Sequence, residues 1–461
     1  MLAPAQRASA PQTSINSFGR AGFFTACLLL INFISDGGPQ RSAGFIHQLV
    51  LLPFTALFLF CLWRLLFVAE VAASRPLWSP HRATFLLLFF ELAAAVLFLY
   101  EAHHFASVGY HLHGILTASF FAVMLLLLAA IAIQRSPRPS HLFAIAITGY
   151  IGGVLLAIVS FPLTYLRSDM MPVILWADTS VLRHIDPYIT MHVADRVYDF
   201  PYLPGMIVAY LPFAAAHLDL RFASIVYVGV STALIYWAAH ADRRREVAAL
   251  LALFLLSPYL QYRHELYLSP HWLTLVAAFV LMQRRRFVWA AFVLGIGMAI
   301  YQFSWIVLPF VLLNALRRRG WFEAAKLAAL AGIGALLLAG PFLATATKRI
   351  ESNTVSQWGL ALHADAQPMN FSYWVTYLIH PDKLLRLQAL LMVGIFLYCF
   401  AKKRCATLED MLRWVIVALT IFILCNVLVD GYFYLMLLVP MLIYTCIAND
   451  WLREPEPTPT T

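Results

Sequence analysis

Residues 83–100 read ATFLLLFFELAAAVLFLY, a run of 18 residues in which Glu91 is the only charged residue. A stretch of about 18 or more apolar residues is long enough to cross the hydrocarbon core of a bilayer. Within lipid the backbone has to satisfy its own hydrogen bonds, so such a run is expected to form a helix. Similar runs recur along the whole chain. The sequence therefore predicts an all-α, polytopic membrane helical bundle with no soluble domain of its own.

The composition favours the same fold class. Hydrophobic residues make up 62% of the chain and charged residues 12%, whereas a soluble domain is roughly half apolar and about a quarter charged. The net charge of +9 comes from short Arg and Lys clusters between apolar runs, a pattern that indicates membrane orientation rather than nucleic-acid binding. The six cysteines include no CxxC motif, so neither a disulfide framework nor a zinc site is expected.

The apolar runs predict roughly 13–14 transmembrane helices. The expected spans are 21–36, 45–69, 83–102, 112–133, 141–166, 220–240, 246–260, 270–283, 287–301, 303–316, 322–346, 387–401, 408–428 and 431–448. The first of them is expected to stay as a membrane anchor, because residues 1–20 do not resemble a cleavable signal.

The chain is expected to have four parts. These are an N-terminal helical extension (1–140), a core (141–346), a second outer loop with the C-terminal helices (347–451), and a disordered Pro-rich tail (452–461). The basic triplets at 243–245, 284–286, 317–319 and 402–404 lie between spans. If they are cytoplasmic, both termini are inside and the polar loops 167–200, 261–270 and 347–386 share the opposite face.

Residues 201–217, PYLPGMIVAYLPFAAAH, need a separate interpretation. A crossing here would place the 243–245 triplet outside. Pro201, Pro204 and Pro212 also divide the segment into pieces too short to span. We expect a re-entrant or interfacial element that forms the wall of a cavity, since irregular backbone at that depth has to be shielded by protein or a water-filled space.

Loop 167–200 carries most of the polar chemistry. It holds five aspartates among arginines, histidines and aromatic residues. Carboxylates accept hydrogen bonds from sugar hydroxyls and aromatic rings stack on sugar faces, and a carboxylate can act as a general base. Long connections of this kind are commonly functional. The loop is therefore the expected site, with a sugar as its expected ligand.

Three elements of this region resemble one family. Asp169 follows a predicted span, DPY stands at 186–188, and YLPG at 202–205 opens the next apolar segment. This order resembles the first outer loop of GT-C glycosyltransferases, most closely mannosyltransferases that use polyprenyl-phosphate mannose. A later stretch, with Gly295, Gly297 and the residues from 301 to 309, resembles the aromatic-rich helix of that family. The resemblance covers roughly 141–316.

The resemblance implies a GT-C-like fold and a role for particular residues. Asp169 matches the catalytic base, and 184–188 match the family's G-x-D-P-Y stretch, with His184 where the family usually has Gly. The motif loop follows the fifth predicted span instead of the first, and no D-x-D motif is present. The expected catalytic residues are Asp169 and Asp178, and those expected to bind substrate are Arg183, Asp186, Tyr188, Tyr202, His264, Glu265, Gln302, Arg349 and His363.

Each candidate also has a structural interpretation. Asp169 could be satisfied by Arg167 or water, and Asp178 could pair with Arg183. Glu265 could pair with Arg263, although ionisable groups near the end of a short span tend to be functional. HELYLSPH at 264–271 lacks the second His of the zinc-protease motif H-E-x-x-H.

The remaining basic and acidic candidates lie elsewhere. Lys348 and Arg349 could pair with a lipid phosphate or anchor the chain at lipid headgroups. His363 could bind phosphate, organise its loop, or be structural. Glu91 lies within a predicted span, where a carboxylate needs a partner. His47 or another polar group across the bundle is expected to provide it.

The favoured function is transfer of one hexose or pentose from a polyprenyl-phosphate donor to a lipid or glycan acceptor on the outer face of a cell inner membrane or an ER-type membrane. Membrane lipids are expected partners and nucleic acid is not; no metal site or cofactor is expected, and metal dependence is open. Two alternatives remain: a transporter or flippase of an amphipathic glycolipid, for which no internal repeat is found, or a non-catalytic assembly subunit.

Overall fold

The computed structural model describes residues 17–36, 45–68, 80–104, 114–134, 138–161, 163, 170–193, 196–262, 267–356, 379–426 and 431–452. Within these ranges the fold is all-α, with 17 α-helices and one two-stranded hairpin. The predicted fold class, a membrane helical bundle, is confirmed. The predicted residues 169, 264, 265 and 363 lie outside the described ranges, as does nearly all of the 452–461 tail.

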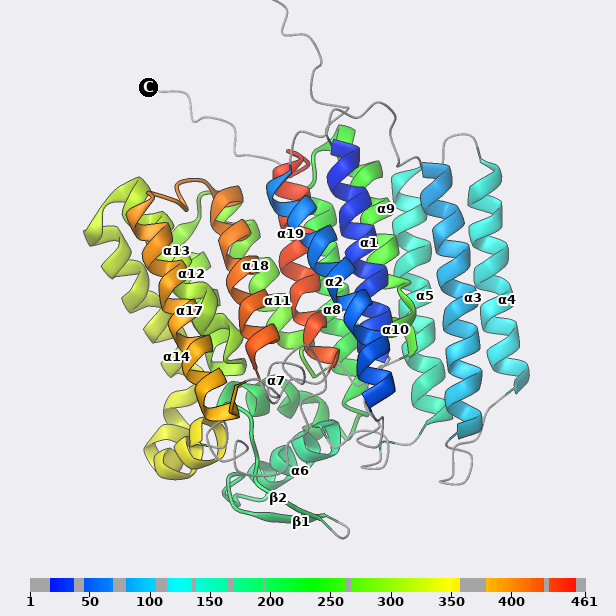
Figure 1. The fold of residues 1–461 in the computed structure, drawn as a ribbon. Helices are drawn as coiled ribbons and strands as arrows, with labels where there is room; N and C mark the ends of the chain where they lie inside the picture. The colour runs from blue at the N-terminus through cyan, green and yellow to red at the C-terminus, as the bar shows by residue number, and fades with distance from the viewer. Residues whose placement is uncertain are drawn as a thin grey trace, which may run out of the picture.

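The elements follow one another as in Figure 1. They are α1 (Ser17–Asp36), α2 (Phe45–Phe67), α3 (Pro80–His104), α4 (Gly114–Ile133), α5 (Pro139–Ser160), α6 (Met170–Leu182), β1 (Met191–Val193), β2 (Arg196–Tyr198), α7 (Pro204–Ala215), α8 (Arg221–Ala238), η2 (Ala241–Arg243), α9 (Arg244–Leu255), α10 (Pro258–Tyr262), α11 (Ser269–Gln283), α12 (Phe287–Ile300), α13 (Phe303–Arg319), α14 (Trp321–Ile350), η3 (Glu351–Ser356), α17 (Pro381–Ala401), α18 (Leu408–Cys425), η4 (Gly431–Leu437) and α19 (Leu438–Ala448).

Six of the described helices are long and apolar enough to cross a membrane: α3, α4, α5, α8, α14 and α17. Further apolar helices of 10–17 residues lie between them. The long helices run side by side through the bundle, with α3 to α5 on one flank and α14 and α17, beside α13, on the other (Figure 1). The length and apolarity of these helices make this a multi-pass membrane protein. The total of 13–14 spans stays a prediction.

Helix α7 occupies the segment for which no crossing was expected. It has 12 residues, which corresponds to about 18 Å at 1.5 Å per residue and is too short for a hydrocarbon core of about 30 Å. Pro204 begins the helix and Pro212 lies inside it. Gly205 lets it approach α12 closely, because a Cβ there would lie 2.6 Å from the carbonyl oxygen of Ala299.

The basic clusters gather at one end of the bundle. Arg20 of α1 bonds the carbonyl of Ala448 at the end of α19, and Arg317 bonds the carbonyl of Phe400 at the end of α17. The hairpin and α6 lie at the opposite end (Figure 1). This arrangement agrees with the separation expected from loop charge. That the basic end faces the cytoplasm stays a prediction.

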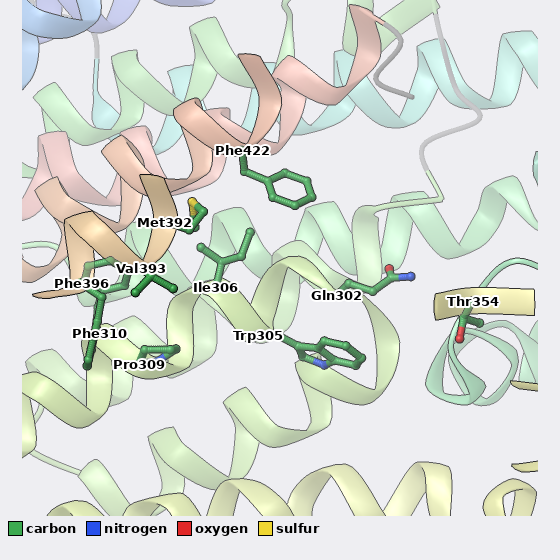
Figure 2. A pocket seen from close by; sticks show the side chains of 10 residues that line it. All are labelled: Gln302, Trp305, Ile306, Pro309, Phe310, Thr354, Met392, Val393, Phe396 and Phe422. Carbon is green, nitrogen blue, oxygen red and sulfur yellow. The ribbon is translucent and has the colours of Figure 1, made fainter. Parts of the chain in front are cut away.

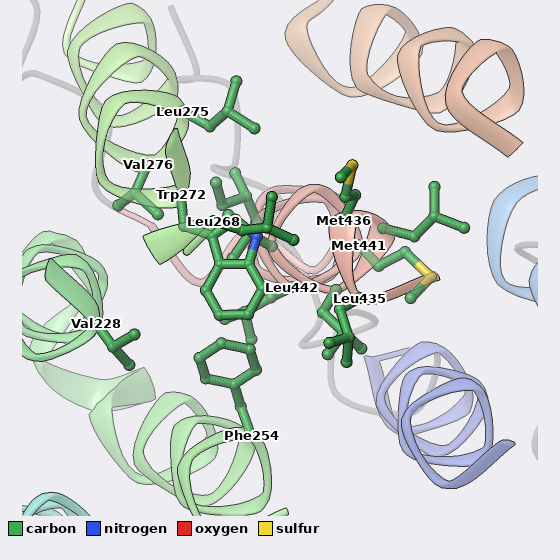
Figure 3. Close-up of a cluster of buried hydrophobic side chains, with 14 of the residues drawn as sticks. Val228, Phe254, Leu268, Trp272, Leu275, Val276, Leu435, Met436, Met441 and Leu442 are labelled. Atoms are coloured by element: carbon green, nitrogen blue, oxygen red, sulfur yellow. The ribbon is translucent and has the colours of Figure 1, made fainter. Parts of the chain in front are cut away.

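A continuous apolar core joins the central helices. Trp272 of α11 is fully buried, and its ring centroid lies 5.8 Å from that of Phe254 in α9. Figure 3 shows these two rings beside Leu442 of α19 and Val228 of α8. Dispersion contacts among such close-packed side chains hold the helices together in lipid, where apolar burial between helices gives little driving force.

The N-terminal helices are packed into this bundle. Helix α1 lies against α2, α19 and η4, and α3 lies against α9 and α10. The hydroxyl of Tyr444 in α19 donates to the carbonyl of Leu66 in α2 at 3.2 Å. Residues from the predicted extension and from the C-terminal helices therefore share one core.

Candidate functional site

The segment expected to be one long loop contains a helix and a hairpin. Helix α6 buries Met171, Ile174 and Asp178, whose spacing of three and four residues places them on one helical face. The hairpin follows, with Met191 opposite Tyr198. The prediction of one long loop was wrong here, because the residues from 170 to 182 have a buried face with helical spacing. These elements lie outside the spanning helices, at the end of the bundle (Figure 1).

His184, two residues after the end of α6, lies in the left-handed backbone region, with φ of 60°. The amide of Ile185 donates to the carbonyl of Ser180 at 2.8 Å, and that of His184 donates to Val181 at 2.9 Å. This is the hydrogen bonding of a helix end at which glycine is favoured. The position where the resembling family usually has Gly is thus one where a glycine would relieve the backbone.

Asp186 organises the turn that follows α6. Its Oδ1 accepts a hydrogen bond from the backbone N–H of Tyr188 at 2.9 Å, a local arrangement in which the side chain replaces a backbone acceptor. Its other oxygen forms an ion pair with Arg349 at the end of α14. Two residues predicted to bind substrate therefore neutralise each other, and both stay partly open to solvent.

A second contact joins the same two segments. Asn353 of η3 donates from Nδ2 to the carbonyl of Tyr188 at 3.1 Å, and the Tyr188 hydroxyl donates to the carbonyl of Tyr202 at 3.0 Å. Burial raises the pKa of Tyr188, and the nearby Asp186 carboxylate adds to the shift. Tyr188 is therefore a neutral hydroxyl that fixes the turn. Asn353 was not predicted, since a single Asn after a basic pair carries no distinctive signal.

Aromatic rings lead from this turn into the bundle. The Tyr188 ring meets Phe200 at a centroid distance of 5.4 Å, and Phe200 meets Tyr202 at 5.4 Å. Tyr202 meets Tyr267 at 5.1 Å, and the hydroxyl oxygens of Tyr267 and Tyr301 lie 3.1 Å apart. We call these five residues the aromatic column. Four of its members, Tyr188, Tyr202, Tyr267 and Tyr301, carry hydroxyl groups, and Tyr202 is the member that stays partly exposed. A tyrosine at such a position offers a ligand both an apolar face and a hydroxyl.

The column continues into the wall of a cavity between α13, α17 and α18. Tyr301 stacks on Phe303 at 5.2 Å, and Phe303 contacts Phe422 at 4.9 Å. The cavity has a volume of about 560 Å³, and its walls are Gln302, Trp305, Ile306, Pro309, Phe310, Thr354, Met392, Val393, Phe396 and Phe422.

Its polar groups lie at one end. Figure 2 shows Gln302 and Thr354 on one side of the cavity, and Phe310 and Phe396 on the other. Thr354 follows Asn353, which contacts the Tyr188 turn. Gln302, predicted to bind substrate, thus lies in the cavity wall, near the point where the aromatic column reaches it. A long apolar ligand with a polar head fits this distribution of side chains.

Asp178 does not form the ion pair with Arg183 that was its structural alternative. Its side chain is fully buried, and neither carboxylate oxygen has a hydrogen-bond partner among the described residues. Burial raises the pKa of Asp178 to about 9, because desolvation disfavours the charged form. Arg183 is exposed at the end of α6. At neutral pH Asp178 is a carboxylic acid, which donates a proton more readily than it accepts one.

The positions of four other candidates are not described. Asp169, His264, Glu265 and His363 lie outside the described residues, so their roles stay predictions from the sequence. Met170, the residue after Asp169, begins α6. In the part of the chain that the structure covers, no three His, Cys, Asp or Glu side chains come together as ligands for a metal ion.

The comparisons with known proteins add no assignment. The chain matches no family model, no curated protein and no solved structure.

Proposed function

We propose that this protein is a membrane glycosyltransferase that moves a sugar from a polyprenyl-phosphate donor to a hydroxyl of an acceptor on the non-cytoplasmic face. One observation carries the proposal: a polar turn with an Asp–Arg pair is joined by the aromatic column to an apolar cavity at the flank of the bundle. Such a site has places for an anionic phosphate, a sugar and a long hydrocarbon chain.

The donor would lie across these places in order. Its isoprenoid chain would occupy the cavity of about 560 Å³ between α13, α17 and α18. Its phosphate would lie near Arg349, because guanidinium groups recognise phosphate oxygens in pairs. Arg349 is held by Asp186 at the surface, so phosphate would compete with or join this ion pair. The sugar would stack beside Tyr202, the partly exposed member of the aromatic column.

The reaction follows from the chemistry of the donor. The acceptor hydroxyl oxygen forms a bond to the anomeric carbon while the bond from that carbon to the phosphate oxygen breaks. Polyprenyl phosphate leaves, and the base takes the acceptor proton. Asp169 is the proposed base, as the family resemblance implies. Arg349 would stabilise the charge that develops on the leaving phosphate. Asp178 would remain protonated in its buried position.

The decisive experiment uses the purified full chain in proteoliposomes. Polyprenyl-phosphate sugars with radiolabelled hexose or pentose are supplied together with membrane lipid and glycan acceptors. Transfer of label to an acceptor supports the proposal. Movement of labelled donor between leaflets without transfer would overturn it in favour of a flippase, and neither transfer nor movement would leave the assembly-subunit alternative.

A variant of the cavity wall tests separately whether the isoprenoid chain binds in the cavity. Photo-crosslinkable polyprenyl phosphate should label the wild-type protein on α13 or α17. Ile306→Trp should reduce labelling, because the larger ring fills the cavity that Ile306 lines. Val230→Trp is a matched control, since Val230 is an exposed apolar residue of the distant α8. Equal labelling of all three proteins would contradict the assignment of the cavity.

A further inference from the structure

A carboxyl group is buried on the opposite flank of the molecule, away from the candidate site. Glu91 of α3 has a fully buried side chain. One of its oxygens accepts a hydrogen bond from Nε2 of Gln261 in α10 at 2.7 Å, and the other has no partner among the described residues. An ionisable group at membrane depth is costly and tends to be retained for a purpose. Gln261 is the polar group across the bundle that the sequence required for Glu91.

Gln261 belongs to a short helix that follows a break in the chain. Helix α9 ends at Leu255, and Pro258 begins the five-residue helix α10. The break leaves backbone donors at the start of α10 that the helix itself cannot satisfy. In lipid such groups require partners from neighbouring protein.

The partner comes from α1. The side-chain oxygen of Asn32 accepts a hydrogen bond from the backbone N–H of Tyr259 at 2.8 Å. The Asn32 amide nitrogen in turn donates to the carbonyl of Leu28 in its own helix at 2.7 Å, which fixes the orientation of the side chain. Asn32 therefore caps α10 from another helix, as a polar residue commonly caps its own helix.

Helix α10 lies close in the sequence to a member of the aromatic column. It ends at Tyr262, and Tyr267 follows five positions later in the sequence. Tyr267 is buried, contacts Tyr202 and pairs with the Tyr301 hydroxyl. Because five positions of chain span at most about 18 Å, the position of α10 limits where Tyr267 can lie.

We propose that Glu91 and Asn32 are positioning residues: through their hydrogen bonds to Gln261 and Tyr259 they hold α10, and thereby set the position of Tyr267 in the aromatic column. The N-terminal helices α1 and α3 are then part of the scaffold of the site. The catalytic consequence rests on the proposed function, whereas the positioning of α10 does not.

The first experiment measures hydrogen–deuterium exchange of peptides that contain α10 in the detergent-solubilised full chain. Glu91→Leu and Asn32→Leu should each speed exchange in α10, on the order of tenfold or more, since a lost hydrogen bond to a charged or buried group has that effect on local opening. Thr25→Val is the control: Thr25 is buried in α1 but bonds only the carbonyl of Ala21 in its own helix.

Conservative variants distinguish a role of Glu91 in positioning α10 from a role of its negative charge. Glu91→Gln keeps an oxygen that accepts from Gln261 and should leave exchange unchanged. The double variant Glu91→Gln with Gln261→Glu restores a carboxyl–amide pair with its partners exchanged, and it should protect α10 as well as the wild type does. Loss of protection in Glu91→Leu together with recovery in the double variant supports the proposal, even if Glu91→Leu is poorly stable.

Sugar transfer gives the second readout. Asn32→Leu should lower kcat more than it raises KM, because the donor cavity lies on the other flank. Normal α10 exchange in Glu91→Leu and Asn32→Leu would overturn the proposal. So would loss of transfer in Glu91→Gln with α10 fully protected, since the charge and not the position would then matter. Absence of transfer in the wild type would count against the proposed function alone, because the exchange measurement stands without it.

Discussion

Two aspartates of the candidate site have opposite chemistry in our interpretation. Asp178 is buried without a partner among the described residues, which keeps its carboxyl protonated. Asp169 precedes the first residue of α6 and is the proposed base. The pair therefore resembles other sites in which two carboxyl groups have different environments and different roles. Only variants of each residue can test this division.

The first prediction concerns Asp169→Asn. An amide has the size of a carboxylate and makes many of the same hydrogen bonds, but it does not accept a proton at neutral pH. Transfer should fall about a hundredfold to ten-thousandfold, the usual effect of losing a general base, with the melting temperature in detergent unchanged. A combined loss of transfer and of about 1–3 kcal/mol of stability would instead indicate a structural aspartate. Near-normal transfer would remove Asp169 as the base.

The second prediction concerns the pH dependence of Asp178. Its folded pKa of about 9 lies above the ordinary value near 4, so between these values the folded state keeps a proton that the unfolded state releases. The contribution of Asp178 to the free energy of unfolding therefore falls as pH rises from about 4 to 9. Asp178→Asn does not titrate, so its melting temperature relative to wild type should rise with pH across this window. A pH-independent difference would show that Asp178 is ionised in the folded protein.

At the scale of elements, short helices shape the site more than the spanning helices do. Helices α6, α7 and α10 have 13, 12 and 5 residues, and each brings polar or aromatic side chains to a defined depth. Close backbone contact holds α7 in place, with Gly205 against Ala299 at the end of α12. The YLPG motif at 202–205 thus combines a column residue, a helix-starting proline and a contact glycine.

The third prediction tests this contact. In Gly205→Ala the new Cβ would lie 2.6 Å from the Ala299 carbonyl oxygen, so one backbone has to move. The free energy of unfolding should fall by about 1–3 kcal/mol, as for other overpacked positions, and transfer should fall with it. Gly229→Ala is the control: nothing lies within 4 Å of its added Cβ, and alanine has the higher helix propensity. Equal melting temperatures of the two variants would contradict the tight packing of α7.

At the scale of the whole molecule, the basic clusters and the polar turn of the candidate site lie at opposite ends of one bundle. The basic end is joined by Arg20 and Arg317, which bond the ends of α19 and α17. The other end carries α6, the hairpin and the Asp186–Arg349 pair. A multi-pass protein with this polarity should have one orientation in its membrane.

The fourth prediction assigns the faces. Single cysteines at positions 183 and 363 should react with a membrane-impermeant reagent added from the non-cytoplasmic side, and cysteines at 244, 285 and 318 should not. The reason is the concentration of Arg and Lys in the short loops of the cytoplasmic face. Since native cysteines are mostly buried, the wild type gives the background. Opposite results at any two positions would contradict the topology.

The sequence by itself determined the fold class and the need of Glu91 for a partner, and it predicted that 201–217 does not cross, because each depends on local composition. Apolar runs require helices in lipid, closely spaced prolines interrupt them, and a carboxyl group within an apolar span calls for a polar partner. It did not reveal that α6 is a helix, although the spacing of Met171, Ile174 and Asp178 contained that signal.

Only the tertiary structure decided which residues meet. Arg349 pairs with Asp186 across 163 positions, and Asn32 caps α10 across 227. Nothing in the local sequence selects such partners, because helices of similar apolarity can pack in many orders. The choice depends on where small residues allow close approach and where buried polar groups find partners, and these conditions are satisfied together only in the folded bundle.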